Sequence, residues 1–410
     1  MRNINNLLRF LTIPFAVSFI TVGCGPKNSF ELINSSDLSL EDHPVIVDRQ
    51  SFKDVRGLPV VRGEDNKIIP TQLEDVDQDG DWDQLIFQSS FGPGEKKVLR
   101  YDWVDRDQYP AFASRTQVYL GHSPERNNVF NPVKSHIRPQ DHIAESQPYL
   151  YQYEGPGWES ELVAFRNYFD SRNGKDIFGK AKPKLYVDSI GLGEDYHALH
   201  DWGMDILKVG TSLGAGALAM LKNDSLYRLT GTGKASFTII SNGPVRSVFE
   251  LRYKDWKVNG SSYELVETIT IWGGKRWYES HVQLLGGHPE DTVVTGIVNL
   301  KKVPSTMLES AGWQVLYSHG KQSENNDMLG MSLLIPNEHF AGFDKAPADG
   351  NGVTNTYTAY LKPQDGAYKF IFYAGWQGED PGFLDKNFFE KKLMTETAQL
   401  SRTIVLNFNK

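Results

Sequence analysis

Short runs of apolar residues separated by turn-forming residues extend along most of the chain. In its second half, apolar and polar positions alternate, which is the period expected of strands. From these runs we predict strands at residues 235–240, 245–253, 263–272, 277–284, 293–300, 357–361, 370–373 and 401–408. One helix is expected near Pro381–Leu393, because Phe383, Phe388 and Leu393 fall at near-helical spacing. The pattern therefore predicts an all-β protein.

Two β-domains are expected. Between residues 44 and 105, at least four short apolar runs alternate with turn clusters, which is typical of a small antiparallel sandwich. We assign residues 44–109 to a small N-terminal β-sandwich and residues 110–410 to a large antiparallel β-sandwich. The architectural analogue of the large domain is the supersandwich of mutarotase-like and polysaccharide-lyase domains, whose concave sheet holds a ligand. A content of 12% aromatic residues with 37 Gly and 20 Pro fits a chain rich in strands and turns.

Alternating carboxylates lie between two of the N-terminal strands, in the segment Asp75–Asp83. Such a run resembles a calcium-binding loop, since Ca²⁺ takes several oxygen ligands. A complete EF-hand loop beginning at Asp75 would need a bidentate Glu at position 86, which is Ile86. We therefore favour a hairpin with an acidic turn over a structural calcium site.

The N-terminus has the features of an export signal. Arg2 and Arg9 precede an uncharged stretch, Phe10–Val22, that is too short to span a bilayer as a helix. Gly23 then stands directly before Cys24, which is the only cysteine in the sequence and is the expected site of lipidation. We predict a lipoprotein signal peptide at 1–23, a tether at 24–43, and a location in the periplasm or at the cell surface, anchored to a bacterial membrane. An ordinary signal peptide is the alternative.

Charge and motif content exclude several classes of function. A net charge of −8 and a pI near 5.7 argue against nucleic acid as a partner, whereas an anionic small substrate is compatible with local cationic groups. The sequence contains no GxSxG elbow, Walker loop, dinucleotide fingerprint or CxxC pair. These absences argue against nucleotide-dependent and thiol chemistry.

A first candidate site lies in residues 151–180. If residues 162–172 form one strand, its period of two places Arg166, Tyr168, Asp170 and Arg172 on one face. A guanidinium can bind a carboxylate bidentately, and a neighbouring phenol can transfer a proton. The alternative is a solvated sheet face with ordinary ion pairs. Polar and aromatic residues just upstream favour a site, and two of them are candidates for substrate binding: Trp158 and Glu159.

A second candidate site lies in residues 196–216. His197 and His200 are three residues apart and would share one face of a helical turn, which suits a metal pair or an acid–base pair. Asp201 follows directly and Lys208 lies nearby, so both are candidates for substrate binding. No HExxH pattern is present, and we predict no metal site.

A third group of polar residues lies on the later strands. Glu279 and His281 share one face of their strand, and Glu250 and Arg252 share a face of another. These faces could line one groove for a sugar, with Glu279 and His281 binding the substrate. The commoner alternative is the solvent side of a sandwich.

The sequence resembles a family of exported bacterial proteins that carry a domain of unknown function. The similarity is strongest in the segments YEGPGWESELVAFRNYFDSRNGKDIFGK and HALHDWGMDILKVGTSLGAGALAM, and it extends from about Asp42 to the end of the chain. Members of the family include dehydratases that act on ulvan oligosaccharides. The resemblance implies loss of water across C4–C5 of a saturated glucuronic or iduronic acid at the non-reducing end of an acidic oligosaccharide. A separate glycuronyl hydrolase would then use the unsaturated product.

This chemistry assigns provisional roles to the candidate residues. Arg166 would stabilise the charge that develops on the substrate carboxylate, with a divalent metal as the alternative. His197 and His200 are the first candidates for base and acid, because histidine titrates near neutral pH, and Tyr168 is the second choice for the acid. No organic cofactor is implied. Two other functions stay open: a non-catalytic glycan-binding lipoprotein, and a mutarotase or epimerase of the same architecture.

Overall fold

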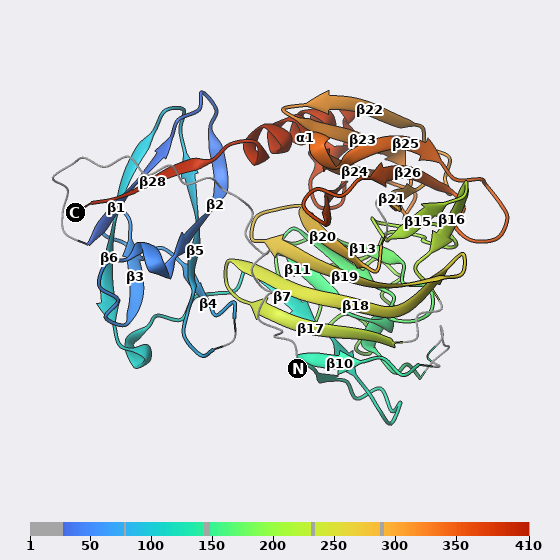
Figure 1. Cartoon of the computed structure of the whole chain (residues 1–410), viewed down its shortest axis with the longest axis horizontal. Coiled ribbons are helices and arrows are strands. Elements are labelled where there is room, and N and C mark those ends of the chain that lie inside the picture. Colours follow the sequence, from blue (N-terminus) through green and yellow to red (C-terminus); the bar gives the residue numbers. More distant parts are fainter. Residues whose placement is uncertain are drawn as a thin grey trace. The chain divides into compact units, whose positions relative to one another are not determined.

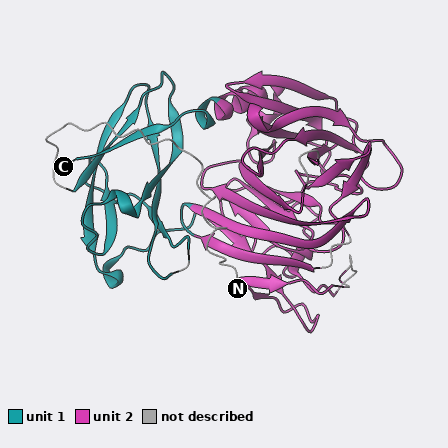
Figure 2. Cartoon of the chain, viewed as in Figure 1, with its two compact units in different colours: residues 1–114, 243–245, 398–410 teal, residues 115–242, 246–397 magenta. Residues whose placement is uncertain are grey.

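A computed structural model describes residues 28–77, 79–140, 142, 148–230, 234–287 and 291–409. The chain divides into two compact units (Figure 2): unit 1 comprises residues 1–114, 243–245 and 398–410, and unit 2 comprises residues 115–242 and 246–397. The predicted signal peptide and Cys24 lie outside the described residues. No helix in the described ranges has the length and apolar character needed to cross a membrane.

Unit 1 consists of two antiparallel sheets. One has the order β28-β1-β6-β3, with bounds Ile404–Phe408, Ser29–Asn34, Lys96–Val104 and Leu58–Arg62. The other has the order β2-β5-β4, with bounds Leu40–Asp48, Gln84–Phe91 and Thr71–Glu74. An aromatic core that includes Phe30, Phe52 and Trp82 lies between the strands.

Two sequence-based boundaries need correction in unit 1. The predicted tether at 24–43 is wrong from Ser29 onward, because Phe30 and Leu32 of β1 are buried in the core and β2 begins at Leu40. The closing strand, assigned above to the large domain, pairs with β1 instead, with Leu406 opposite Leu32. The apolar side chains of both segments complete the core of unit 1, and the strand pattern alone did not reveal this pairing.

Unit 2 contains a nine-stranded antiparallel sheet and two five-stranded antiparallel sheets (Figure 1). The nine-stranded sheet has the order β10 (Ser135–Ile137), β17 (Lys234–Asn242), β18 (Arg246–Val258), β19 (Ser261–Trp272), β20 (Trp277–Leu285), β27 (Ala367–Trp376), β24 (Met328–Pro336), β23 (Trp313–Lys321) and β22 (Ser305–Ser310). One five-stranded sheet has the order β14 (Gly203–Asp205), β13 (Lys175–Lys180), β12 (Val163–Asn167), β11 (Gly157–Ser160) and β7 (Thr116–Tyr119). The other has the order β16 (Ser225–Arg228), β15 (Ala219–Lys222), β21 (Thr292–Val298), β26 (Thr356–Leu361) and β25 (Phe340–Lys345).

The main core of unit 2 lies between the nine-stranded sheet and the two smaller sheets. Phe165 and Trp158, from the sheet that contains β11 and β12, pack against Tyr278 and Phe249 of the nine-stranded sheet, with ring centroids 4.9–5.2 Å apart. This arrangement confirms the predicted all-β antiparallel sandwich. The helix α1 runs over Lys386–Leu400, later than predicted, because residues Pro381–Leu384 form a separate 3₁₀ turn.

Strand alternation decides which residues of the sheet β14-β13-β12-β11-β7, called the smaller sheet below, face away from the core. In β12 and β13, Phe165 and Ile177 belong to the core, so Arg166 and Asp176 point to the opposite face of that sheet. A second, small aromatic cluster covers part of this outer face and includes Tyr153, Phe178 and Tyr196. The charged residues described next lie on this face.

Candidate functional site

Arg166 is the centre of a buried charged cluster on the outer face of the smaller sheet. β12 and β13 pair so that Arg166 lies opposite Asp176, and β14, which pairs with the other edge of β13, ends at Asp205. The Nη2 of Arg166 lies 2.7 Å from Asp176 Oδ2 and 2.6 Å from Asp205 Oδ2, and each of the three side chains is 3% exposed or less. Register therefore brings together two carboxylates and a guanidinium that are far apart in the sequence.

A strained turn adds a third carboxylate to this cluster. Tyr153 and Glu154 have φ angles of 38° and 70°, which non-glycine residues rarely adopt. The next residue must be Gly155, because a Cβ there would lie 2.1 Å from the backbone oxygen of Asn167. The turn places Glu154 3.7 Å from Nη1 of Arg166 and 2.6 Å from Nη2 of Arg172. Backbone strain at this position is thus used to hold a charged side chain between two guanidinium groups.

Arg172 is a member of the cluster that reaches the protein surface. Its guanidinium lies over the ring of Tyr168 at 3.9 Å, and its Nε and Nη2 donate to Asp170 while Nη2 also donates to Glu154. The side chain is 34% exposed, and Nη1 has no hydrogen-bond partner among the described residues. Arg172 is therefore fixed by carboxylates on one edge and can offer the other edge to an anion.

His197 is a second member of the cluster that reaches the protein surface. Its Nδ1 lies 3.5 Å from Asp205 Oδ2, and its side chain is 63% exposed. The imidazole lies beside the ring of Tyr196, with centroids 4.5 Å apart, and the hydroxyl of Tyr196 accepts a hydrogen bond from Arg166. An exposed imidazole over a buried carboxylate is an arrangement suited to proton transfer.

Burial changes the proton affinities of the groups beneath His197. Burial and the neighbouring Asp176 raise the pKa of Asp205 well above its usual range, although Arg166 opposes this change. Burial likewise raises the pKa of Tyr196 to about 12, again against the effect of Arg166. The carboxyl group of Asp205 therefore binds a proton more tightly in the folded protein than in the unfolded chain.

Tyr149 is a phenol at the same cluster that is not fully buried. Burial and the charge of Glu154 raise the pKa of Tyr149, whereas Arg166 and Arg172 lower it, so its hydroxyl lies within the field of all three charged groups. A neutral phenol in this position can donate a proton. Together, His197 and Arg172 place an exposed imidazole and a partly exposed guanidinium on one network.

The role predicted above for Arg166 needs correction. Its Nε, Nη1 and Nη2 donate to Asp176, Asp205, Tyr168, Tyr196 and the backbone oxygen of Tyr153, and its side chain is 1% exposed. Tyr168 is also enclosed, because its hydroxyl donates to Asp176 and accepts from Arg166. Both residues hold the cluster together, and neither directs a free polar group toward solvent. The predicted strand also ends early, at Asn167, so the contacts of Tyr168 arise from the turn that follows it.

His200 makes different contacts from His197. The predicted helical turn is not present: residues 197–202 form turns, and His200 bonds through Nε2 to the backbone oxygen of Asp195 at 2.8 Å. Its Nδ1 lies 3.5 Å from Glu194, which also accepts a hydrogen bond from Trp202. His200 therefore orders the loop that carries His197 and is not part of an imidazole pair.

Two predicted substrate-binding residues lie inside the fold. Trp158 is fully buried in the core, and Glu159 is fully buried in an ion pair with Lys180 at 2.7 Å. Glu159 also accepts hydrogen bonds from the backbone N–H groups of Tyr186 and Val187. Neither side chain can contact a ligand at the surface, because both alternate into packed layers of the sandwich.

The other predicted binding residues occupy three different environments. Asp170 is 1% exposed and holds Arg172, so it acts on a ligand only through that residue. Asp201 is almost fully exposed and pairs with Lys182 at 3.0 Å. Lys208 is exposed and lines a small pocket with neighbours that include Lys301 and Gln322.

Glu279 and His281 lie on the far side of the sandwich from Arg166. In β20, Tyr278 and Val282 belong to the core, so Glu279 and His281 point away from it, and Glu279 pairs with Lys369 at 2.9 Å. Glu250 of β18 and His281 of β20 both lie opposite Thr268 of β19, so the two polar faces of these strands are on one side of the nine-stranded sheet, as predicted. Arg166 leaves the same core on the other side, through the sheet that contains β12, so it cannot line a groove with them.

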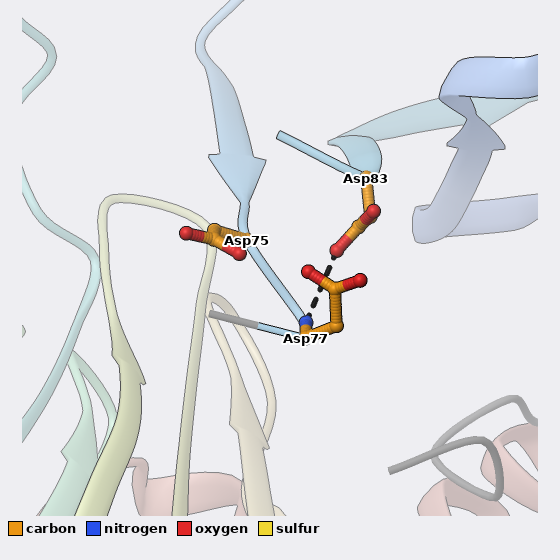
Figure 3. Close-up of side chains that lie close together, drawn as sticks. All are labelled: Asp75, Asp77 and Asp83. Carbon is orange, nitrogen blue, oxygen red and sulfur yellow. Dashed lines mark hydrogen bonds between the residues drawn. The ribbon is translucent and has the colours of Figure 1, made fainter. Parts of the chain in front are cut away.

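The acidic segment of unit 1 forms the turn of a hairpin, as predicted. β4 and β5 pair with Glu74 opposite Gln84, and the carboxylates of Asp75, Asp77 and Asp83 come within 4.8 Å of one another (Figure 3). Asp83 accepts hydrogen bonds from the backbone N–H groups of Val76 and Asp77, and Asp75 accepts one from that of Gly80. These bonds give the acidic residues a structural role in the turn.

Asp176, Asp205 and Tyr149 were absent from the predicted site. A signal for Asp176 was present, since Lys175, Asp176 and Lys180 lie in a strand in which all six residues are buried, and buried charges require partners. Nothing in the local pattern around Asp205 or Tyr149 pointed to Arg166, because strand order and a strained turn create those contacts.

Comparisons with known proteins give one family and several distant likenesses. The family model described as "Domain of unknown function (DUF4861)" matches residues 32–405. The chain is 24% identical over 356 residues to "Uncharacterized protein P7" of Formosa agariphila, covering 82% of this chain and 80% of that protein.

Two solved structures, both from Enterococcus faecalis, are also similar. An alpha-mannosidase has a TM-score of 0.49 at 8% identity, and a protein in the glycosyl hydrolase family 38 has a TM-score of 0.48 at 10% identity. Each match covers 94% of this chain, which spans about half the length of those proteins (47% and 48%).

Proposed function

The chain belongs to the family described as Domain of unknown function (DUF4861), and we propose that it is a dehydratase of acidic oligosaccharides. The substrate is a saturated glucuronic or iduronic acid at the non-reducing end, and the product carries a C4=C5 double bond. The observation that carries the proposal is that one buried network presents an exposed imidazole, that of His197, and a guanidinium nitrogen of Arg172 that has no partner among the residues the structure describes. The choice of a uronate follows from the resemblance of the two motif segments to ulvan-oligosaccharide dehydratases.

The reaction requires three functions from the protein. A base removes the proton from C5, the electron pair forms the C4=C5 bond, and the C4–O bond breaks as an acid protonates the leaving hydroxyl. One water molecule is released, and no oxidant or reductant is needed. Because negative charge develops on the carboxylate next to C5, a fixed cation at that carboxylate lowers the barrier.

The proposed roles follow from exposure and contact. Arg172 binds the substrate carboxylate through Nη1, because its other nitrogens are held by Asp170 and Glu154. His197 removes the C5 proton, and Asp205 beneath it stabilises the resulting imidazolium. Tyr149 donates to the 4-hydroxyl. Asp205 also contacts Nη2 of Arg166, so it connects His197 to the buried network.

A direct assay tests this proposal. Mature protein is incubated with oligosaccharides ending in a saturated uronic acid, while ultraviolet absorbance is followed for a new C4=C5 bond and mass spectrometry for the loss of one water. We expect both signals in the wild type and neither in His197→Ala. His200→Ala is the matched control, because this neighbouring imidazole contacts Asp195 and Glu194 and lies outside the network of Arg166.

Other outcomes would replace the proposal. Binding by calorimetry without either signal would identify a glycan-binding protein. Exchange of the C5 proton for deuterium without loss of water would identify an epimerase that uses the same base. Full activity of His197→Ala would place the chemistry elsewhere.

Export and lipidation of Cys24 are part of the same proposal. A lipid-anchored enzyme would meet oligosaccharides outside the cytoplasm. The Cys24→Ser variant should lose the acyl mass and leave the membrane fraction in a bacterial host, and an unchanged membrane fraction would contradict the anchor.

A further inference from the structure

Two histidines that take no part in the network above lie side by side in unit 2. His122 ends β8 (Gly121–His122) and His136 is the middle residue of β10, with ring centroids 4.2 Å apart and planes at 44°. Tyr151 lies against both rings, at 5.7 Å from His122 and 5.5 Å from His136. A further imidazole, that of His142, lies 5.1 Å from the ring of Tyr151.

Backbone pairing fixes both imidazoles. β8 pairs with β9 (Asn131–Pro132), and a separate bridge joins His122 to Tyr151. β10 is an edge strand of the nine-stranded sheet, and His136 lies opposite Phe237. The two side chains therefore come from separate elements of unit 2, each held by its own strand pairing.

The Nε2 atom of His136 is buried and has no hydrogen-bond partner among the described residues. Burying a polar nitrogen without a partner costs about 1–3 kcal/mol, so such an atom calls for a ligand, a water or an ion.

The two rings lie close enough to share one ion after a modest movement. Two imidazoles bound to one tetrahedral zinc ion through nitrogens at about 2.0–2.1 Å have ring centres roughly 5 Å apart. The observed distance is 4.2 Å, so the rings would have to move apart by about 1 Å to admit an ion. Imidazole suits Zn²⁺, Cu²⁺ and Ni²⁺, whereas Ca²⁺ and Mg²⁺ prefer oxygen ligands.

We propose that His122 and His136 bind a divalent transition-metal ion. Two protein ligands leave coordination positions for water or for an oxygen of a bound sugar. Arg138, two residues after His136, donates from Nη1 to the backbone oxygen of Asp170 and to Asn173, in the loop that carries Arg172. The ion would thus lie next to the loop that binds the substrate carboxylate in the proposed function, although metal binding itself does not depend on that function.

Metal titration tests the proposal without any substrate. The full mature chain, free of any histidine tag, is dialysed against EDTA and titrated by calorimetry with Zn²⁺ and with Cu²⁺. We expect saturable binding of one ion per chain, and nitrogen hyperfine splitting in the electron paramagnetic resonance spectrum of the Cu²⁺ form. Loss of a ligand should weaken binding by at least 10–100-fold, the loss typical of removing an outer-shell partner.

Two ligand variants and two control variants make the result specific. His136→Ala and His122→Ala should each lose the site, with thermal melts to show that both remain folded. His197→Ala and Asp77→Asn are the controls, since they remove an exposed imidazole and an acidic-turn carboxylate elsewhere and should bind as the wild type does. Equal binding by wild type and His136→Ala, or no ion at a stoichiometry of one, would overturn the proposal. Loss of dehydratase activity with metal binding intact would affect only the proposed function.

Discussion

Two of the buried ionic clusters on the sheet β14-β13-β12-β11-β7 differ in how they end. The Lys180–Glu159 pair is fully buried, and its remaining polar atoms bond to backbone groups of Ser160, Lys184, Tyr186 and Val187. The Arg166 cluster is equally buried at its centre, but its outer members His197 and Arg172 are exposed. We call the Lys180–Glu159 cluster closed, because both of its side chains are fully buried. We call the Arg166 cluster open, because two of its side chains reach solvent.

This difference separates a structural cluster from a functional one. Burying charge is costly in both, and in both the charges are paired and hydrogen-bonded. A closed pair can only hold strands β11 and β13 together. An open cluster connects its buried charges to exposed side chains that a ligand can contact. We therefore propose that the reaction takes place at the Arg166 cluster. Glu159 is fully buried and contacts Lys180, whereas Glu154 is 17% exposed and lies between Arg166 and Arg172.

The largest expected effect is on turnover at the open cluster. His197→Ala should lower kcat by about 10²–10⁴-fold, which is the usual contribution of an acid–base group. Because the side chain is 63% exposed, the melting temperature should stay near that of the wild type. Kinetics on uronate oligosaccharides measure the first quantity and thermal melts the second. A large fall in melting temperature would instead make His197 a structural residue.

Removing the buried cation should lower stability by a similar amount in the two clusters, but it should lower activity only in the open cluster. Arg166→Met and Lys180→Met each leave buried carboxylates without a counter-ion, so each should lower the free energy of unfolding by about 3–5 kcal/mol. Below the melting temperature, Lys180→Met should retain kcat per folded molecule and Arg166→Met should lose it. Chemical denaturation and kinetics at low temperature make the comparison. Equal losses of kcat in the two variants would remove the distinction between closed and open clusters.

The proton held by the open cluster gives a pH-dependent effect. Since the pKa of Asp205 is raised in the folded protein, its contribution to stability is present below the unfolded value of 3.8 and is lost as pH rises through the raised value. Relative to Asp205→Asn, the wild type should therefore lose stability with rising pH, by at most about 1.4 kcal/mol per pH unit. Denaturation of both proteins over a pH series measures the difference. A wild type that gains stability over this range would indicate an ordinary ionised pair with Arg166.

A smaller effect is expected at the anion-binding edge. Arg172→Lys keeps one positive charge but cannot hold Asp170, Glu154 and a substrate carboxylate at once, because the ammonium lacks the planar fork. We expect KM to rise about tenfold, equivalent to about 1.4 kcal/mol, with a smaller change in kcat. Steady-state kinetics on a uronate-ended oligosaccharide and on its carboxyl-reduced form provide the control. The variant should affect the first substrate and leave the second unchanged.

The amino-acid pattern was sufficient for the fold class and for several of the strands. Alternation identified β19 and β20 almost to their ends, because each has one face in the core and one outside. It ended β18 too early, at Tyr253, because the pairing of that strand is irregular between Tyr253 and Trp256. It could not show that the last strand pairs with β1, since pairing between distant strands leaves no local signal. The strand through Arg166 was predicted too long because Tyr168 and Asp170 continue the alternation after the backbone has turned.

The candidate site was predictable only in part, for the same physical reason. Arg166, Arg172 and His197 were found because charged residues in a β-rich segment are conspicuous. Their partners Asp176 and Asp205 depend on the order β14-β13-β12, and Glu154 depends on backbone strain at the turn before Gly155. Sequence periodicity assigns a residue to a face, but it does not say whether that face is closed by packing.

The smallest expected effect is at an ion pair that belongs to neither cluster. Asp201 and Lys182 lie 3.0 Å apart with side chains 99% and 50% exposed, so solvent screens their attraction. Asp201→Asn should change the free energy of unfolding by less than about 0.5 kcal/mol and leave KM unchanged. Asp201 lies only four residues from His197, which makes this variant a sharp control for the loop itself. If Asp201→Asn raised KM as Arg172→Lys does, a substrate would have to contact this exposed edge, and the open cluster would extend beyond the network centred on Arg166.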